Sequence, residues 1–334
     1  MTTTVTHSGV RSASWLGLAL GLAVAVALVA WQGAVTVAHL LASTRWTLLL
    51  VAGFAVPQML LATASWRLLF PPGGAPRFSL AQLALWIGFS INLLLPVASI
   101  GGDVVRARLL ARWTGKTRDA VASVVVDKTV QVATLPALGL IGIAAFFHLL
   151  PNGGSIGPAL AGVILLAVGI ALAVLVQRAG VFAFLAARAE RLVRKSSWDG
   201  LVDRASDLDG AIRALYRRPA TILGSWSLRL LARLSLSGEV WLAARLLGHP
   251  ITLPDAILLK TFSLVMRAVA FPVPAGLGVQ EGSFVVLGPL IGLPPDVALA
   301  TSLASRAREI VSSVPGLFAW AYVEGRDLRR RRAA

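Results

Sequence analysis

The sequence predicts an all-α polytopic membrane protein with about six spanning helices and two re-entrant helical hairpins, arranged as an inverted repeat. Three observations predict this fold class: 57% of the 334 residues are hydrophobic, 14% are charged, and the mean hydropathy is +0.78. This composition excludes an ordinary soluble domain. Helices are expected because a helix satisfies its own backbone hydrogen bonds inside a bilayer. We expect residues 1–334 to form a single transmembrane domain.

Six stretches are long and apolar enough for full crossings, because a spanning helix needs about 20 apolar residues. These stretches are 15–40, 46–69, 120–147, 156–176, 220–247 and 297–322. The first lies in a segment, 15–45, that is too long for a signal peptide and lacks a small-residue cleavage site. We therefore expect it to be a retained helix.

Two further apolar stretches, 79–95 and 255–271, run into loops rich in Pro and Gly at 95–103 and 271–281. Pro and clustered Gly do not continue a helix, so the freed backbone groups need partners inside the protein or in a wet cavity. After each loop the sequence predicts a short second helix, at 104–113 and 282–291. These two broken segments are the predicted re-entrant hairpins.

The placement of basic residues predicts the orientation. Nine Lys and Arg residues lie in 178–218, five in 104–118 and five in the tail 324–334, whereas 129–177 and 272–305 contain none. Basic loops remain cytoplasmic. We therefore expect a multi-pass protein of the bacterial inner membrane with both termini in the cytoplasm, and hairpins that enter from opposite sides.

The two halves also share sequence anchors, which predict repeats over 46–147 and 219–323. The anchor pairs, separated by 176–179 positions, are Pro96 and Pro272, Asp103 and Glu281, Asp119 and Asp296, Lys128 and Arg306, and Pro136 and Pro315. Chance matching of short Pro, Gly and Leu strings is the alternative explanation. Inverted repeats around broken helices are common in secondary transporters, whose substrate site lies between the repeats.

The segment between the repeats, 156–218, is predicted to contain a linking helix and a cytoplasmic amphipathic part. From 178 to 218 charged and apolar residues alternate at helical spacing. Such helices lie along anionic headgroups. A solvated linker is the alternative for this part.

The acidic residues of the two loops, Asp103 and Glu281, begin the short helices, where they can cap free N–H groups or contribute to a site. Because they are repeat mates, we predict that they form one site. Glycines precede them and can turn backbone N–H groups toward an anion such as a lipid phosphate. The glycines of this expected backbone anion site are Gly101, Gly102, Gly276 and Gly278.

Charged residues within the apolar spans cost about 2.5–3.5 kcal/mol each on insertion scales, so they need partners or a function. Lys128 and Arg306 are repeat mates. We expect them either to pair with Asp127 and Glu309 or to bind a substrate phosphate. Arg267 has no acidic neighbour in sequence, which makes it the favoured substrate-facing cation.

Further polar residues complete the predicted substrate site. Arg229 can extend to the cytoplasmic headgroups, whereas Arg233 and Glu239 on the same span are candidate site residues. Asn92 and Gln280 lie next to the helix breaks and can bind freed backbone groups or a ligand.

Several activities are excluded by motif. The chain contains no Cys and four scattered His residues, so we expect no metal site. It also lacks a nucleotide-binding phosphate loop and the nucleophile motifs of hydrolases. We expect no catalytic residue, no cofactor and no nucleic-acid partner, because the net charge of +16 follows the membrane pattern.

Several strings resemble the flippase-like transmembrane domain of the lysylphosphatidylglycerol synthase family. They are Trp66-Arg67-Leu68-Leu69, Asn92-Leu93-Leu94-Leu95-Pro96-Val97, Gly101-Gly102-Asp103, Ala122-Ser123-Val124-Val125-Val126-Asp127, Pro274-Ala275-Gly276-Leu277-Gly278-Val279-Gln280-Glu281-Gly282 and Ala304-Ser305-Arg306-Ala307-Arg308-Glu309. The resemblance covers about residues 15–325, and within the family it is greatest to membrane proteins associated with hopanoid biosynthesis.

This resemblance implies translocation of an anionic phospholipid or a hopanoid-type lipid between leaflets. The aminoacyltransferase of that family is a separate soluble domain with no counterpart in this chain, so aminoacyl transfer is not expected. The alternatives are a membrane-embedded transferase and an accessory scaffold that works with the enzymes of polyprenyl or hopanoid lipid biosynthesis.

Overall fold

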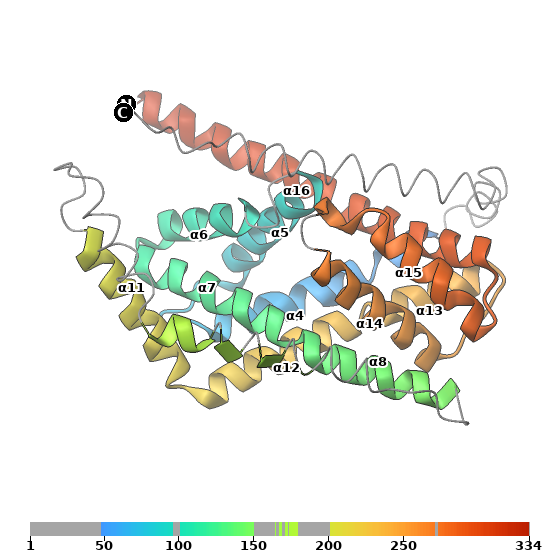
Figure 1. Cartoon of the computed structure of the whole chain (residues 1–334). Helices are drawn as coiled ribbons and strands as arrows, with labels where there is room; N and C mark the ends of the chain where they lie inside the picture. The colour runs from blue at the N-terminus through green and yellow to red at the C-terminus, as the bar shows by residue number, and fades with distance from the viewer. Residues whose placement is uncertain are drawn as a thin grey trace, which may run out of the picture.

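The computed structural model describes residues 48–95, 101–149, 201–270 and 273–333, together with short pieces between 164 and 179. The predicted span 15–40, most of 156–176 and the loop residues 96–100 lie outside the described residues. Within the described part, all regular secondary structure is helical, as expected (Figure 1).

The first half contains six described helices. They are α3 (Leu48–Ala52), α4 (Ala55–Leu68), α5 (Phe78–Leu94), α6 (Gly101–Thr114), α7 (Thr117–Ala133) and α8 (Leu135–Leu149). The second half begins after the linking segment. Its elements are α11 (Leu201–Tyr216), α12 (Pro219–Leu234), α13 (Ser237–Leu246), α14 (Leu253–Val269), η3 (Pro274–Gly276), α15 (Val279–Leu287), η4 (Gly288–Ile291) and α16 (Pro295–Ala333).

Local sequence accounts for the ends of several helices. At the start of α14, Thr252 and Asp255 form a capping box, in which each side chain binds the backbone N–H of the other residue. Proline stands in the first turn of α12 and of α16, where its missing N–H is not needed. These signals fix helix starts without help from distant residues.

The stretches 46–69 and 220–247 are not the continuous helices that the sequence predicts. The first is interrupted between α3 and α4 at Gly53 and Phe54, and the second between α12 and α13 at Ser235 and Leu236. The two breaks lie against each other, since a Cβ atom on Gly238 would come within 2.3 Å of the Phe54 ring. The two interruptions, which contain no proline, therefore lie at one crossing of the two segments.

The run Thr117–Phe147, formed by α7 and α8, is long and apolar enough to cross a membrane, and it is the one such run among the described residues. Two shorter apolar runs, Phe78–Leu94 and Val279–Ile291, belong to the two broken segments. Their length suits hairpins that enter a bilayer without crossing it.

The two halves pack in the same order. In the first half α5 packs on α6 and on the distant α16, and in the second half α14 packs on α15 and on the distant α8. Helices α4 and α12 pack against each other between these groups (Figure 1). The opposite membrane orientation of the halves, and with it the inverted repeat, stays a prediction.

The first hairpin depends on a close approach of α5 and α6. A Cβ atom on Gly102 would lie 1.9 Å from the carbonyl oxygen of Gly88, so neither position has room for a larger residue. The side chain of Asn92 on α5 accepts the N–H of Gly102 at 2.7 Å. This contact holds the start of α6 against the end of α5.

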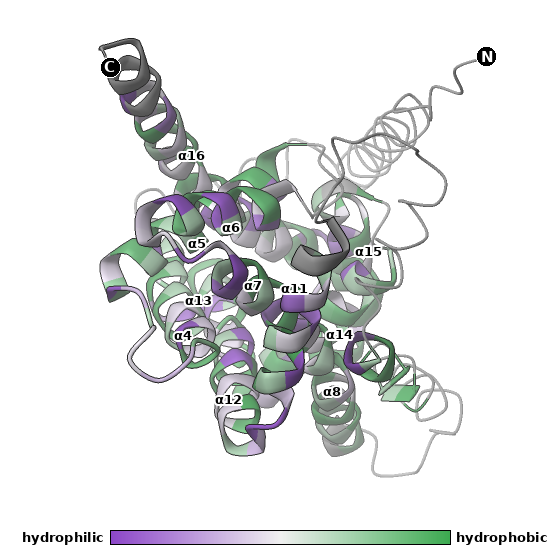
Figure 2. Ribbon diagram, turned by 90° about the vertical axis from the view of Figure 1, so that its left-hand side faces the viewer, coloured by the Kyte–Doolittle hydropathy of each residue, from purple (hydrophilic) through white to green (hydrophobic). Residues whose placement is uncertain are grey.

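Hydrophilic residues gather at one end of the molecule, where α6, α7 and α11 lie together, while α8 is almost entirely hydrophobic (Figure 2). Helix α11 belongs to the predicted amphipathic segment. Its side chains Ile212 and Leu215 are buried in a cluster with α7 and Trp66. The apolar side of α11 therefore packs on protein and is not free to lie along headgroups.

Candidate functional site

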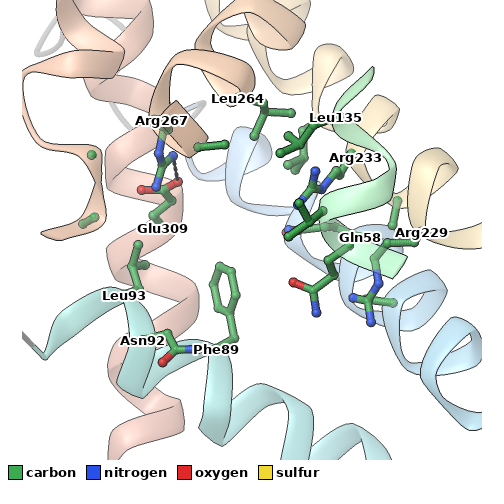
Figure 3. A pocket seen from close by; sticks show the side chains of 18 of the residues that line it. Gln58, Phe89, Asn92, Leu93, Leu135, Arg229, Arg233, Leu264, Arg267 and Glu309 are labelled. Carbon is green, nitrogen blue, oxygen red and sulfur yellow. Dashed lines mark hydrogen bonds and ion pairs between the residues drawn. The ribbon is translucent and has the colours of Figure 1, made fainter. Parts of the chain in front are cut away.

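A cavity of about 510 Å³ lies between the two halves. It is lined by residues of α4, α5, α7, α8, α12, α14, η3 and α16 (Figure 3). Phe89 and Leu93 of α5 face it from one side, and Leu135 of α8 and Leu264 of α14 from another. Transporters with inverted repeats bind substrate at such a place, and the substrate site itself stays a prediction.

The cavity wall is apolar over much of its area but carries many charges. Among the described lining residues six are basic, namely Lys128, Arg229, Arg233, Lys260, Arg267 and Arg308, and one is acidic, Glu309. In Figure 3 Arg267 and Glu309 face Arg233 and Gln58 across the cavity. The lining therefore combines apolar surface, which suits hydrocarbon, with N–H donors, which suit an anion.

Behind one side of the cavity lies a group of five charged residues, which we call the first ion network: Asp103, Arg106, Asp127, Lys128 and Arg229. Asp127 is fully buried and binds Nη1 of Arg106 at 2.7 Å and the guanidinium of Arg229. Asp103 binds Arg106 at 3.1 Å and Nζ of Lys128 at 2.8 Å. The Arg106 guanidinium also lies 4.8 Å from the centre of the Trp66 ring, within the range of a cation–π contact.

The opposite side contains the second ion network: Glu239, Lys260, Arg267, Glu281, Arg306, Arg308 and Glu309. Glu309 is its centre, with Arg267 at 2.7 Å, Arg306 at 3.0 Å and Arg308 at 3.7 Å. Arg306 also binds Glu281 at 2.7 Å. The carboxylate of Glu309 therefore keeps three guanidinium groups close together.

Glu239 extends the second ion network to a neighbouring helix. It binds Nζ of Lys260 at 2.5 Å and the guanidinium of Arg308. Arg308 in turn donates to Gln58 of α4 at 3.3 Å. The network therefore joins α13, α14 and α16 to α4.

The repeat mates Lys128 and Arg306 make equivalent ion pairs. Lys128 binds Asp103, and Arg306 binds the mate of Asp103, Glu281. The expected pair of Arg306 with Glu309 is present, whereas the contact seen for Lys128 is with Asp103 rather than Asp127. Asp103 and Glu281 bind different basic partners and belong to different networks, and that they contribute to one site stays a prediction.

Three arginines that the sequence singles out have protein partners in the structure. Arg267 lines the cavity as predicted, but it is held by Glu309 at 2.7 Å and by the side chain of Gln280 at 2.8 Å. Arg229 does not reach headgroups, because it is buried against Asp127. Arg233 does not meet Glu239, and it donates instead to the hydroxyl of Thr134 at 2.8 Å.

The glycines of the expected backbone anion site make internal contacts. The N–H of Gly102 is bound by Asn92, and the N–H of Gly276 is bound by the carbonyl of Val273 at 3.0 Å. The carbonyl of Gly276 accepts Arg306 at 2.8 Å. Gly101 begins α6, and Gly278, with φ at +76°, precedes α15. The chain's own groups therefore fill the places at Gly102 and Gly276 that an anion would take.

Four members of the networks were not predicted as site residues: Arg106, Arg229, Lys260 and Arg308. Lys260 stands two turns before Arg267 on an apolar helix, and a lysine in such a place is itself a signal of a partner or a function. Arg106 lies in the basic stretch 104–118 and Arg308 in the last apolar span, but sequence alone does not assign either residue to the site. Their partners lie on other helices, and sequence spacing does not reveal such pairs.

The model of the lysylphosphatidylglycerol synthase TM region matches residues 18–316. The chain belongs to this family. No curated protein and no solved structure matches the chain. Membership agrees with the helical transmembrane fold and fits a membrane lipid-related role. The hopanoid association stays a prediction.

In this member of the lysylphosphatidylglycerol synthase TM family, basic side chains outnumber acidic ones around the cavity. The two networks and Arg233 together contain eight basic and five acidic side chains among the described residues, an excess of three positive charges. Buried charges need compensation. An anionic ligand in the cavity would supply it.

Proposed function

We propose that this protein moves a lipid with a phosphate-bearing headgroup between the two membrane leaflets, without catalysing a covalent step. The observation that carries the proposal is the cavity of about 510 Å³ between the halves, with six basic residues on an apolar wall. A phosphate-bearing headgroup fits such a lining because guanidinium groups bind phosphate with charge-assisted hydrogen bonds.

The size of the cavity limits what it holds. Pockets that bury drug-sized molecules have volumes of about 300–1,000 Å³. A headgroup fits within 510 Å³, while the acyl chains remain outside in the bilayer. The proposed translocation therefore carries the charged part of the lipid through protein and leaves the apolar part in hydrocarbon.

The test is translocation of fluorescent phosphatidylglycerol in proteoliposomes, read as fluorophore that becomes accessible to a membrane-impermeant quencher. We expect wild-type protein to accelerate accessibility over protein-free liposomes. Ala268→Trp, which places a large ring at the cavity wall, should remove most of this acceleration. Ala220→Trp at an exposed position of α12 is the matched control and should behave as wild type.

Two results would contradict the proposal. One is wild-type protein that moves no lipid faster than empty liposomes. The other is equal translocation by Ala268→Trp and wild type, which would place the path elsewhere. Covalent product formed by purified protein from a lipid donor would favour the transferase alternative.

A further inference from the structure

We infer that the cavity selects lipids whose headgroup is net negative and carries no ammonium group, and that Arg233 is the residue that determines this selectivity. The inference rests on the proposed function, since it names the class of lipid that the same cavity takes. Most charged side chains around the cavity are already engaged in ion pairs, and Arg233 differs from them.

Within the described residues, the cavity offers no carboxylate for an ammonium group. All five acids of the two ion networks already bind basic side chains. The lining acid, Glu309, is held by Arg267, Arg306 and Arg308. A lipid ammonium group would have to displace one of these guanidinium groups and leave it buried without a partner, which is costly.

The lining also lacks an aromatic cage, the other means by which proteins bind ammonium groups. Phe89 is the one aromatic residue among the described lining residues. Cages for quaternary or methylated ammonium use several rings, and Phe is a weaker partner than Trp. Neither of the usual ways to bind an ammonium group is therefore present in the described lining.

Arg233, unlike the acids of the two ion networks, is a charged residue without an ion-pair partner among the described residues. Among the described residues its hydrogen-bond partner is the Thr134 hydroxyl at 2.8 Å, and no carboxylate lies within ion-pair distance. A guanidinium has five N–H donors, so most of those on Arg233 are available to a ligand. It lines the cavity and faces the pair of Arg267 and Glu309 across it (Figure 3).

A neighbouring donor strengthens this assignment. Arg229, one turn before Arg233 on α12, lines the same cavity and is 6% exposed. Its Nη2 binds Asp127, but its Nε is buried without a hydrogen-bond partner. Arg229 therefore places a second guanidinium beside Arg233 at the cavity wall, and guanidinium groups bind phosphate with charge-assisted hydrogen bonds.

The occupant we infer is a lipid rather than a soluble phosphate ester. Most described lining residues are apolar, among them Leu85, Leu93 and Leu264. Val132 and Val269 also line the cavity, yet their side chains are 37% and 66% exposed at the protein surface. In a transmembrane protein such apolar exposure faces hydrocarbon, so the cavity borders the acyl chains of a bound lipid.

The test is native mass spectrometry of the full chain in detergent. Phosphatidylglycerol, phosphatidylethanolamine and lysylphosphatidylglycerol are added at equal concentration, and the bound fraction of each is measured. We expect phosphatidylglycerol to bind about tenfold or more tightly than the two lipids with ammonium groups, as for charge-assisted hydrogen bonds. Glycerol 3-phosphate is the soluble arm and should displace phosphatidylglycerol only weakly.

Arg233→Gln should reduce binding of phosphatidylglycerol about tenfold or more and bring the three lipids to similar affinity. Arg233→Lys keeps the charge and should retain part of the preference. Neither change unpairs a described carboxylate, so both variants are expected to fold. Arg245→Gln, on the exposed end of α13, is the matched control and should leave the preference intact.

Three outcomes would overturn the inference: binding of lysylphosphatidylglycerol or phosphatidylethanolamine as tight as that of phosphatidylglycerol, an unchanged preference in Arg233→Gln, or no retention of any lipid. Displacement by glycerol 3-phosphate at equal concentration would overturn the assignment to lipid. Translocation in proteoliposomes is measured separately. Protein that still moves lipid without this selectivity would refute the inference and leave the proposed function standing.

Discussion

The first and second ion networks contain equivalent ion pairs in different surroundings. In the first, Lys128 binds Asp103 and its side chain is 40% exposed. In the second, Arg306 binds Glu281 and its side chain is 10% exposed. Arg306 also binds Glu309 and the carbonyls of Ala275 and Gly276, at 3.0, 2.7 and 2.8 Å.

This difference indicates which side of the cavity is held more rigidly. A flexible, partly exposed lysine forms a point contact, whereas a buried arginine with several acceptors fixes the groups around it. The same pair of repeat positions therefore gives a partly exposed ion pair in the first half and a buried ion pair with several acceptors in the second half. The comparison can be tested by substitution.

The largest expected effect is that of Arg306→Ala. It leaves two buried carboxylates, Glu281 and Glu309, with fewer partners, and breaking a buried ion pair costs about 3–5 kcal/mol. Lys128→Ala in the first network should cost less than Arg306→Ala, because the Lys128 side chain is 40% exposed and Asp103 keeps Arg106 as a partner. Thermal unfolding in detergent, followed by fluorescence of the ten tryptophans, measures both. Equal shifts in the two variants would contradict the comparison.

A smaller loss is expected for Glu309→Gln. The amide keeps the shape of the carboxylate but removes the charge shared by Arg267, Arg306 and Arg308, at a cost of about 2–3 kcal/mol. Glu324→Gln is the control, since its partner Arg108 is exposed and the pair lies outside the cavity. A lower unfolding midpoint for Glu309→Gln alone is the expected result. If both variants unfold at the same temperature, Glu309 is not the centre of the second ion network.

The smallest expected effect concerns the backbone beside Arg306. Gly276 has φ at +59°, and a Cβ atom there would lie 2.6 Å from Cγ of Arg267. Gly276→Ala should therefore cost about 1–2 kcal/mol for the left-handed conformation, with an added displacement of Arg267. Gly282→Ala on α15 meets no atom within 4 Å and serves as control. Gly276→Ala should have the lower unfolding midpoint of the two variants. A lower midpoint for Gly282→Ala would argue against rigid packing around the second ion network.

Local signals in the sequence predict the hairpins well. The expected helices 79–95 and 104–113 correspond to α5 (Phe78–Leu94) and α6 (Gly101–Thr114). Pro and Gly clusters act through the backbone of the residues themselves, so they can be read without the fold. The breaks at Phe54 and Leu236 could not be predicted in this way. Both residues keep helical dihedral angles, and the two breaks come together only in the fold.

The candidate site was predicted in part. Charges placed in apolar spans identify Asp127, Arg267, Arg306 and Glu309 as residues that need partners. The partners themselves could not be predicted, since Arg229 is 102 residues from Asp127. Arg233 illustrates the same limit, because its lack of a carboxylate is a property of the folded structure and not of its neighbours in sequence.

The excess of three positive charges around the cavity makes ligand binding part of the folding equilibrium. A lipid that binds the folded chain and not the unfolded one stabilises it by mass action, by about 2.7 kcal/mol when its concentration is 100 times the dissociation constant. Under the proposed function, anionic lipid therefore also determines how long this protein survives outside the membrane. Solubilisation conditions that strip such lipid would then remove a folding partner as well as the proposed substrate.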